Sequence, residues 1–191
     1  MKESFEKVLD EGYCLSTRTI FFSEEIDRES ADSFIKRLHI LDNHKSGTIT
    51  VRFGTEGGCV INGFRMYNAI RASKNHVRGL IDGECSSMGT VIMQGFDERL
   101  LLPDSFLMLH VGEQTISGHP KNNENWLNLY KHYDNRCYEI YLEKINNKQR
   151  EKKKKQLKLK ELQTMLDFDT IMLPEKVISI GLADGVLEGA Y

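Results

Sequence analysis

The chain has 191 residues, 40% of them hydrophobic and 28% charged, which is the balance of a soluble globular protein with a sizeable core. Its formal net charge of -2 gives no general attraction for nucleic acid, so we expect no nucleic-acid partner. No apolar run approaches the roughly 18 residues that a membrane-spanning helix needs, and no membrane partner is expected. The start, MKESFEKVLDEGY, is charged and shows no secretory signal, which favours a cytoplasmic protein.

The cysteines and histidines give little support for a metal site. Cys14, Cys59, Cys85 and Cys137 form neither a C-x-x-C pair nor a zinc-like spacing. No two histidines stand four residues apart, as they would on one face of a metal-binding helix. We therefore expect reduced thiols and no metal.

Strand-like and helix-like segments alternate up to residue 110. Apolar, β-rich runs predict strands at 18–23, 47–54 and 77–82, and a further strand within 99–110 that ends at His110. Apolar residues at helical spacing predict helices over 29–44 and 63–73. This alternation favours an α/β fold with a mainly parallel sheet and helical crossovers.

A different pattern begins at residue 123. Aromatic and apolar side chains recur at helical spacing over 123–145, which is more typical of packing than of cofactor binding. The next stretch, 146–163, is strongly basic and helix-prone, and we expect a solvated extension or a mobile hairpin that chemistry does not need. The remaining chain returns to an apolar pattern, with Gly181 as a helix stop before a short final strand.

The sequence CSSMG, residues 85–89, lies between an apolar strand-like run and an apolar helix-like run. A sharp strand-to-helix turn lifts a serine hydroxyl clear of a sheet and aims the following backbone N–H groups at a substrate carbonyl. Ser87, directly before Met88, would occupy such a turn. Ser86 and Ser87 are equally compatible with helix caps that carry no chemistry.

Two further features fit a nucleophilic serine. The paired glycines Gly57 and Gly58 follow a predicted strand. They are compatible with a tight turn, and equally with a ledge whose backbone binds an extended peptide and donates hydrogen bonds to an oxyanion. His110 closes an apolar strand, and strand ends at one edge of a parallel sheet are where α/β sites lie. A Ser–His couple also needs an acid, and spacing does not choose between Asp167 and Asp169.

Several segments, in the right order, resemble motifs of the ClpP-type serine peptidases, the proteolytic subunits of Clp proteases. They are RTIFFSEEID, EGGCVINGFRMYNAI, GECSSMGTVIM, LLLPDSFLMLH and DFDTIMLPEKVISIGLADGV. The resemblance implies that Ser87 is the nucleophile, His110 the general base and Asp169 the triad acid. It also implies an oxyanion hole formed by the backbone N–H groups of Gly58 and Met88.

The same resemblance implies a fold and an activity. The fold would be one ClpP/crotonase-like domain over residues 1–191, with repeated ββα units, a mainly parallel sheet and a protruding handle helix. Residues 123–163 would be this handle and a basic insertion. The activity would be that of a serine endopeptidase without metal or organic cofactor, hydrolysing unfolded proteins or peptides inside a ring-shaped chamber.

The resemblance further implies partners. Subunits would form a seven-membered ring, alone or stacked as a tetradecamer, supplied with polypeptide substrates by a separate AAA+ unfoldase ATPase. The chain itself carries no Walker A motif. It departs from the family pattern at Glu56, which replaces a proline, and in the segment after His110, so the stacking of rings stays open.

Three alternatives remain. A crotonase-type acyl-CoA enzyme would share the fold but would not need serine, histidine and aspartate at these positions. A non-catalytic, ClpR-like assembly subunit would have lost triad residues that this chain keeps. The basic stretch also suits a phage copy of the peptidase that acts in capsid maturation.

Overall fold

The computed structural model describes residues 11–112 and 115–188. The charged start, residues 1–10, lies outside the described residues. The strands are β1 (Tyr13–Cys14), β2 (Thr19–Phe22), β3 (Ile49–Thr55), β4 (Val77–Ser86), β5 (Glu98–Leu101), β6 (Phe106–Leu109), β7 (Thr170–Met172) and β8 (Gly185–Val186). The helices are α2 (Arg28–His44), α3 (Val60–Arg71), α4 (Met88–Met93), α5 (Pro120–Glu151), α6 (Leu159–Met165) and α7 (Pro174–Ile180).

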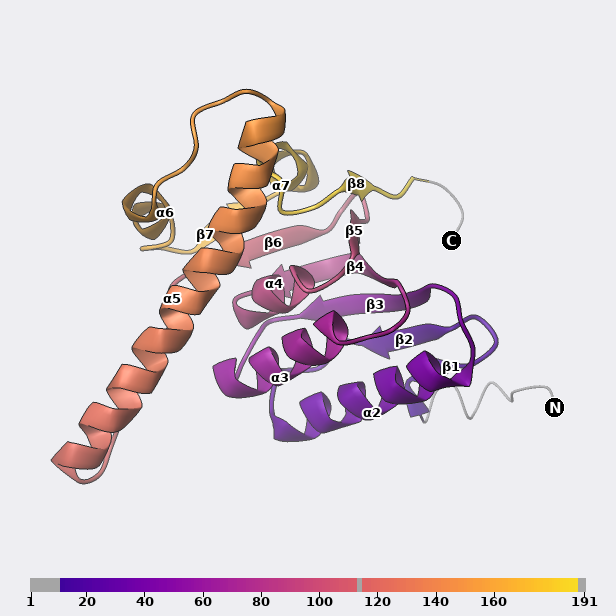
Figure 1. The fold of residues 1–191 in the computed structure, drawn as a ribbon, viewed down its shortest axis with the longest axis horizontal. Helices are drawn as coiled ribbons and strands as arrows, with labels where there is room; N and C mark the ends of the chain where they lie inside the picture. The colour runs from indigo at the N-terminus through magenta and orange to yellow at the C-terminus, as the bar shows by residue number, and fades with distance from the viewer. Residues whose placement is uncertain (1–10, 113–114, 189–191) are drawn as a thin grey trace.

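The strands form one mixed sheet in the order β1-β2-β3-β4-β5-β8, and β6 and β7 extend it from β4 (Figure 1). The pairs from β2 through β5 to β8 are parallel, as is the β4–β6 pair. Antiparallel pairing occurs between β1 and β2 and between β6 and β7. The predicted α/β fold with a mainly parallel sheet is therefore confirmed.

The segment 99–110 contains parts of two strands, where the sequence predicted one. Pro103 has no backbone N–H for a ladder, and Ser105 folds back to bond the carbonyl of Leu102. The resulting turn separates β5 from β6, and each pairs with a different half of β4. This division carries the chain from one half of β4 to the other and brings His110 to the same end of the sheet as Ser87.

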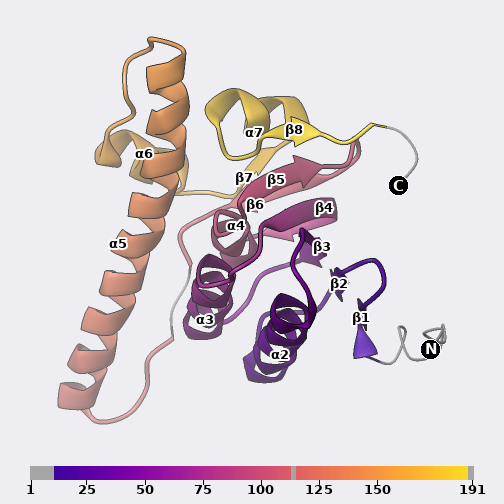
Figure 2. The same ribbon diagram turned by 45° about the vertical axis from the view of Figure 1, so that its right-hand side comes forward.

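Aromatic residues fill the centre of the core, between the sheet and the helices α2, α3 and α4 (Figures 1 and 2). Phe22 stacks on Phe53 with ring centroids 5.3 Å apart, and Phe34 and Phe96 meet these two rings edge-on at 5.7 Å. Offset stacks and edge-to-face contacts are the preferred geometries of aromatic pairs. The apolar positions predicted for helix 29–44 supply this core, since Ala31, Phe34, Leu38 and Leu41 are buried.

Helix boundaries follow from local hydrogen bonding. Asp27 caps the start of α2: its carboxylate accepts from the Ser30 amide while the Ser30 hydroxyl accepts from the Asp27 amide. Gly181 directly follows α7 and adopts φ 93°, a left-handed conformation that glycine tolerates best. The predicted helix stop at Gly181 is thus confirmed.

α5 extends beyond the predicted range 123–145 in both directions, from Pro120 to Glu151. Its C-terminal half packs on the core through Ile140, Tyr141 and Ile145, while the N-terminal half projects from the body (Figure 1). In the described ranges, no helix has both the length and the apolar character required to cross a membrane.

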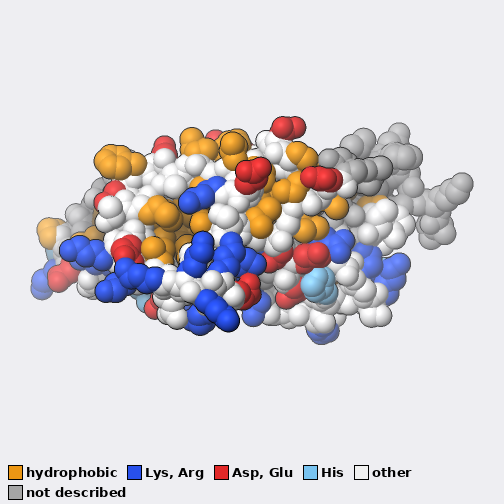
Figure 3. Space-filling view, turned by 90° about the horizontal axis from the view of Figure 1, so that it is seen from above, with side chains coloured by type: hydrophobic (Ala, Val, Ile, Leu, Met, Phe, Trp, Pro, Cys, Tyr) orange, Lys and Arg blue, Asp and Glu red, His pale blue; other side chains and the backbone are white. Residues whose placement is uncertain are grey.

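The basic stretch 146–163 forms the end of α5, a turn and most of α6, and it differs in part from the expected solvated extension or mobile hairpin because some of its residues pack on the core. Residues 146–151 continue α5, and the side chain of Asn146 both accepts from and donates to the backbone of Leu157. Leu162 on α6 is fully buried, so the apolar residues hidden among the lysines help to close the core. Most of the stretch is exposed as expected, including 150–156 and 158–161, and Figure 3 shows Lys and Arg side chains gathered on this side of the molecule.

We predict that Gly79→Ala destabilises the fold and that Gly83→Ala does not. A Cβ at Gly79 would lie 2.1 Å from the buried ring of Phe96, whereas a Cβ at Gly83 would meet nothing within 4 Å. Overpacking of this kind costs about 1–3 kcal/mol, while an uncrowded substitution stays within about 0.5 kcal/mol. Urea denaturation of the two variants measures the difference, and equal stabilities would contradict the packing described for β4.

Candidate active site

Ser87 occupies a strained turn between β4 and α4. Its φ of 52° and ψ of -123° are unusual for a residue with a side chain, and its amide donates to the Met108 carbonyl at 2.7 Å. Ser86, by contrast, is buried, and its hydroxyl donates to Glu84 at 2.7 Å. The turn predicted from CSSMG is therefore present, and of the two serines it is Ser87 that reaches the open side of the sheet.

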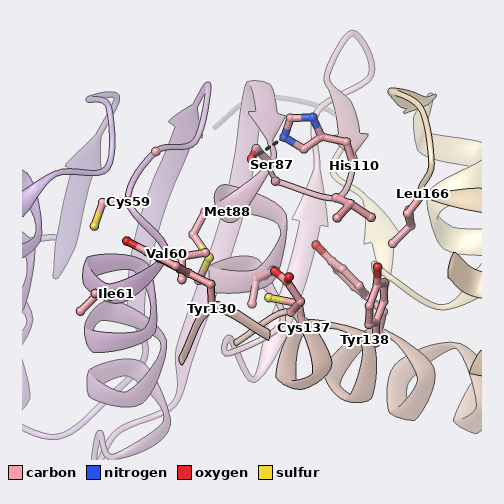
Figure 4. Close-up of a pocket in the computed structure, with 16 residues that line it drawn as sticks. Cys59, Val60, Ile61, Ser87, Met88, His110, Tyr130, Cys137, Tyr138 and Leu166 are labelled. Carbon is pink, nitrogen blue, oxygen red and sulfur yellow. Dashed lines mark hydrogen bonds between the residues drawn. The ribbon is translucent and has the colours of Figure 1, made fainter. Parts of the chain in front are cut away.

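A hydrogen-bonded chain links Ser87, His110 and Asp169. The Ser87 Oγ lies 2.8 Å from His110 Nε2 (Figure 4). On the other side of the ring, His110 Nδ1 lies 3.1 Å from Asp169 Oδ1. A carboxylate at Nδ1 favours the tautomer with its proton on Nδ1, which leaves Nε2 free to accept the serine proton.

Strand pairing decides which of the two aspartates meets the histidine. β6 and β7 are antiparallel, with Leu109 opposite Thr170, so the following His110 faces the preceding Asp169. The carboxylate of Asp169 is 66% exposed, while the imidazole is 29% exposed. The structure thus brings Asp169, and not Asp167, to His110.

The paired glycines form a ledge beside Ser87. Both have positive φ, 107° at Gly57 and 136° at Gly58. A Cβ on Gly57 would lie 2.7 Å from the Ser87 Cβ, and one on Gly58 would lie 2.4 Å from the Ile26 carbonyl oxygen. Only glycine permits both this backbone conformation and this close approach.

Hydrogen bonds fix the ledge without using the Gly58 amide. The Ile26 amide donates to the Gly57 carbonyl, and the Cys59 amide donates to the Ile26 carbonyl, both at 2.7 Å. Within residues 11–112 and 115–188, neither the Gly58 nor the Met88 amide donates a hydrogen bond. Both amides are thus available to an acceptor outside the chain.

The Ser87 and His110 side chains border a cleft of about 400 Å³ between the sheet edge and α5 (Figure 4). Its lining is mainly apolar and aromatic: Gly58, Cys59, Val60, Ile61, Ser87, Met88, Val91, His110, Val111, Gly112, Tyr130, Asp134, Cys137, Tyr138, Tyr141 and Leu166. The hydroxyls of Tyr141 and Thr90, 2.6 Å apart, hold α5 against α4.

The α5 wall of this cleft was not predicted from the sequence. The aromatic stripe over 123–145 was interpreted as packing, and Tyr141 and Ile140 do pack. Tyr130, Asp134 and Tyr138 have the same helical spacing but line the cleft. Burial raises the pKa of Cys137 to about 12, and the nearby Asp134 adds to the rise, so this thiol stays protonated at neutral pH.

The part of the chain that the structure describes contains no group of three or more His, Cys, Asp or Glu residues able to hold a metal ion. No disulfide joins Cys14, Cys59, Cys85 and Cys137 in this part of the chain. What the site offers chemically is a hydroxyl beside an imidazole, a carboxylate behind the imidazole, and two free backbone amides. Serine hydrolases use this combination of groups for acyl transfer.

The fold is α/β, the groups at this site are those that serine hydrolases use, and comparison with known proteins gives the family. The Clp protease family model matches residues 3–190, so the chain belongs to the Clp protease family. The resemblance inferred from the motifs is thereby confirmed.

Named relatives agree with this family. The ATP-dependent Clp protease proteolytic subunit of Deinococcus radiodurans is 26% identical, over 91% of this chain and 82% of that protein. Proteolytic subunit 1 of Chlamydia abortus is also 26% identical, over 91% of this chain and 88% of that protein. The chloroplastic proteolytic subunit 3 of Arabidopsis thaliana is 26% identical over 97% of this chain and 58% of that protein.

We predict that Ser87→Gly is more stable than Ser87→Ala by about 1 kcal/mol, because only alanine keeps a Cβ at this positive φ. Both variants lack the hydroxyl and lose the same hydrogen bond to His110, so the comparison isolates the backbone strain. Thermal or urea unfolding measures it. An alanine variant as stable as the glycine variant would show that the turn is not strained.

Proposed function

We propose that this chain is a ClpP-like serine endopeptidase that hydrolyses peptide bonds in unfolded proteins or peptides. The observation that carries the proposal is the continuous chain from Ser87 Oγ through His110 to Asp169, at 2.8 and 3.1 Å. Membership of the Clp protease family supports the same activity.

In this mechanism His110 Nε2 takes the proton of Ser87 as its oxygen attacks the peptide carbonyl. Asp169 keeps the imidazole oriented and stabilises its charged form. His110 then gives the proton to the leaving amine, and an acyl-enzyme remains on Ser87. Water, activated by the same histidine, hydrolyses this ester and restores the serine.

The free amides of Gly58 and Met88 suit the negative charge that develops on the carbonyl oxygen. They are fixed before substrate arrives, since the ledge is tied to Ile26 and the Met88 amide belongs to the first residue of α4. Each donor of this kind contributes on the order of 10²–10³ in rate. No metal or organic cofactor enters this chemistry.

We further propose that residues 1–191 act as one ClpP-like domain, with α5 as a handle helix in a ring of subunits. Large apolar side chains exposed at two places support contacts between subunits. Trp126 and Leu127 lie on α5, while Ile171 lies in β7 and Phe168 and Leu173 lie on either side of that strand, with Phe168 83% exposed. A cytoplasmic AAA+ ATPase would supply substrates, since the chain carries no Walker A motif and its relatives are named ATP-dependent.

The proposed activity predicts covalent labelling of Ser87 by a fluorophosphonate probe. Mass spectrometry of the labelled full chain should locate the adduct on Ser87, with no label in Ser87→Ala. Ser86→Ala is the matched control and should still be labelled, because the Ser86 hydroxyl is buried against Glu84. An adduct on Ser86 alone would overturn the assignment of the nucleophile.

The same labelling reaction tests whether Asp169 is the acid of the proposed triad. Asp169→Asn should slow labelling and peptide hydrolysis by about three to four orders of magnitude, because the imidazole loses its preferred tautomer. Asp167→Asn is the control and should keep the wild-type rate. If the intact wild type is neither labelled nor hydrolytic, a non-catalytic, ClpR-like assembly role replaces the proposed peptidase.

For assembly, we expect sedimentation to detect a heptamer or a tetradecamer. Trp126→Glu and Leu173→Glu should each shift the distribution toward smaller species, since both replace exposed apolar contacts by charge. A stable wild-type monomer at micromolar concentration would contradict the ring.

A further inference from the structure

Asp134 is the only carboxylate among the described residues that line the active-site cleft. It is partly buried, and within the described ranges its carboxylate makes no ion pair or hydrogen bond, while the neighbouring Arg136 pairs with Glu139 instead. Burial raises its pKa above the ordinary value for aspartate. A partly desolvated carboxylate without a partner is costly in a structural role and is therefore a candidate for binding a ligand.

The position of Asp134 on α5 directs it at the cleft. It lies on the same helical face as Tyr130, Cys137 and Tyr141, at spacings of four, three and four residues. This face is anchored because the Tyr141 hydroxyl meets that of Thr90 on α4. Figure 4 shows Cys137 and Tyr138 on α5, across the cleft from Ser87 and His110.

The cleft has the shape and chemistry for one long side chain. Gly58, Ser87 and Met88 all line the cleft, so a residue whose carbonyl oxygen rests against the Gly58 and Met88 amides can extend its side chain into it. Its walls include Val60, Met88 and Val91, which suit an aliphatic stem. Its volume of about 400 Å³ exceeds the space that a lysine or arginine side chain needs.

The charges around the cleft favour a cation at its far side. Among the described lining residues, Asp134 is the one acid and His110 the one residue that can become positive. Tyr130 and Tyr138 also line the cleft, and aromatic rings attract cations in addition to the carboxylate. The charge of Asp134 acts on another residue that lines the cleft: together with burial, it raises the pKa of Tyr138.

We propose that Asp134 selects a basic side chain, lysine or arginine, at the residue whose carbonyl Ser87 attacks. This inference rests on the proposed peptidase function and names its substrate class. The aliphatic stem packs on the apolar walls, and the ammonium or guanidinium group pairs with the Asp134 carboxylate. Acidic side chains are rejected by the same charge.

The test uses fluorogenic peptide amides that differ only in the last residue: lysine, arginine, leucine, glutamine or glutamate. The wild-type full chain should cleave the lysine and arginine peptides with the highest kcat/KM. In Asp134→Asn the ratio of lysine to leucine should fall by about 10- to 100-fold, the range for loss of a charged partner. Asp134→Lys should bring the glutamate peptide above the lysine peptide.

Asp167→Asn is the matched control, since Asp167 also acts on Tyr138 electrostatically but does not line the cleft. This variant should keep the wild-type ratio. A fluorophosphonate probe without a peptide side chain separates the two proposals. If Ser87 is labelled but wild type prefers leucine and Asp134→Asn leaves the ratio unchanged, the selection of basic residues is wrong and the peptidase stands. If Ser87 is never labelled and no peptide is cleaved, both proposals fail.

Discussion

The hydrogen bond from the Ser87 amide to the Met108 carbonyl joins the end of β4 to β6, and the whole site depends on this junction. β4 pairs with β5 along its first half and with β6 along its second half. Ser87 follows β4 and His110 follows β6, so this single pairing brings the hydroxyl and the imidazole together. The antiparallel partner of β6, β7, then delivers Asp169 to the other side of the ring.

Tight packing on the opposite side of Ser87 makes the geometry rigid. The Gly57–Gly58 ledge leaves no room for side chains, and α4 starts one residue after the strained turn. Strain of this kind persists only where neighbouring structure fixes it, and here the sheet, the ledge and α4 all do so. The site is therefore set by the fold before any substrate binds.

The sequence predicted the parts of this arrangement that local patterns encode. Alternation and helical spacing located most elements, and the strand–serine–helix pattern located the turn at Ser87. Spacing could not choose between Asp167 and Asp169, because that choice depends on the register of β7 against β6. The roles of Asp134, within the aromatic segment, and Leu162, within the lysine-rich segment, were missed for a related reason. The surroundings of both residues are formed by segments that are distant in the sequence, so local patterns do not predict them.

The two hydrogen bonds between Asn146 and Leu157 close the exposed turn 152–156 at its base. Because these hydrogen bonds fix both ends of the turn, residues inserted within 152–156 should not displace α6 or β7. Fluorescent or affinity labels introduced in this turn would therefore report on the molecule from outside the cleft while the distance from Asp169 to His110 is preserved. The same hydrogen bonds make this end of α5 a natural attachment point for probes of assembly.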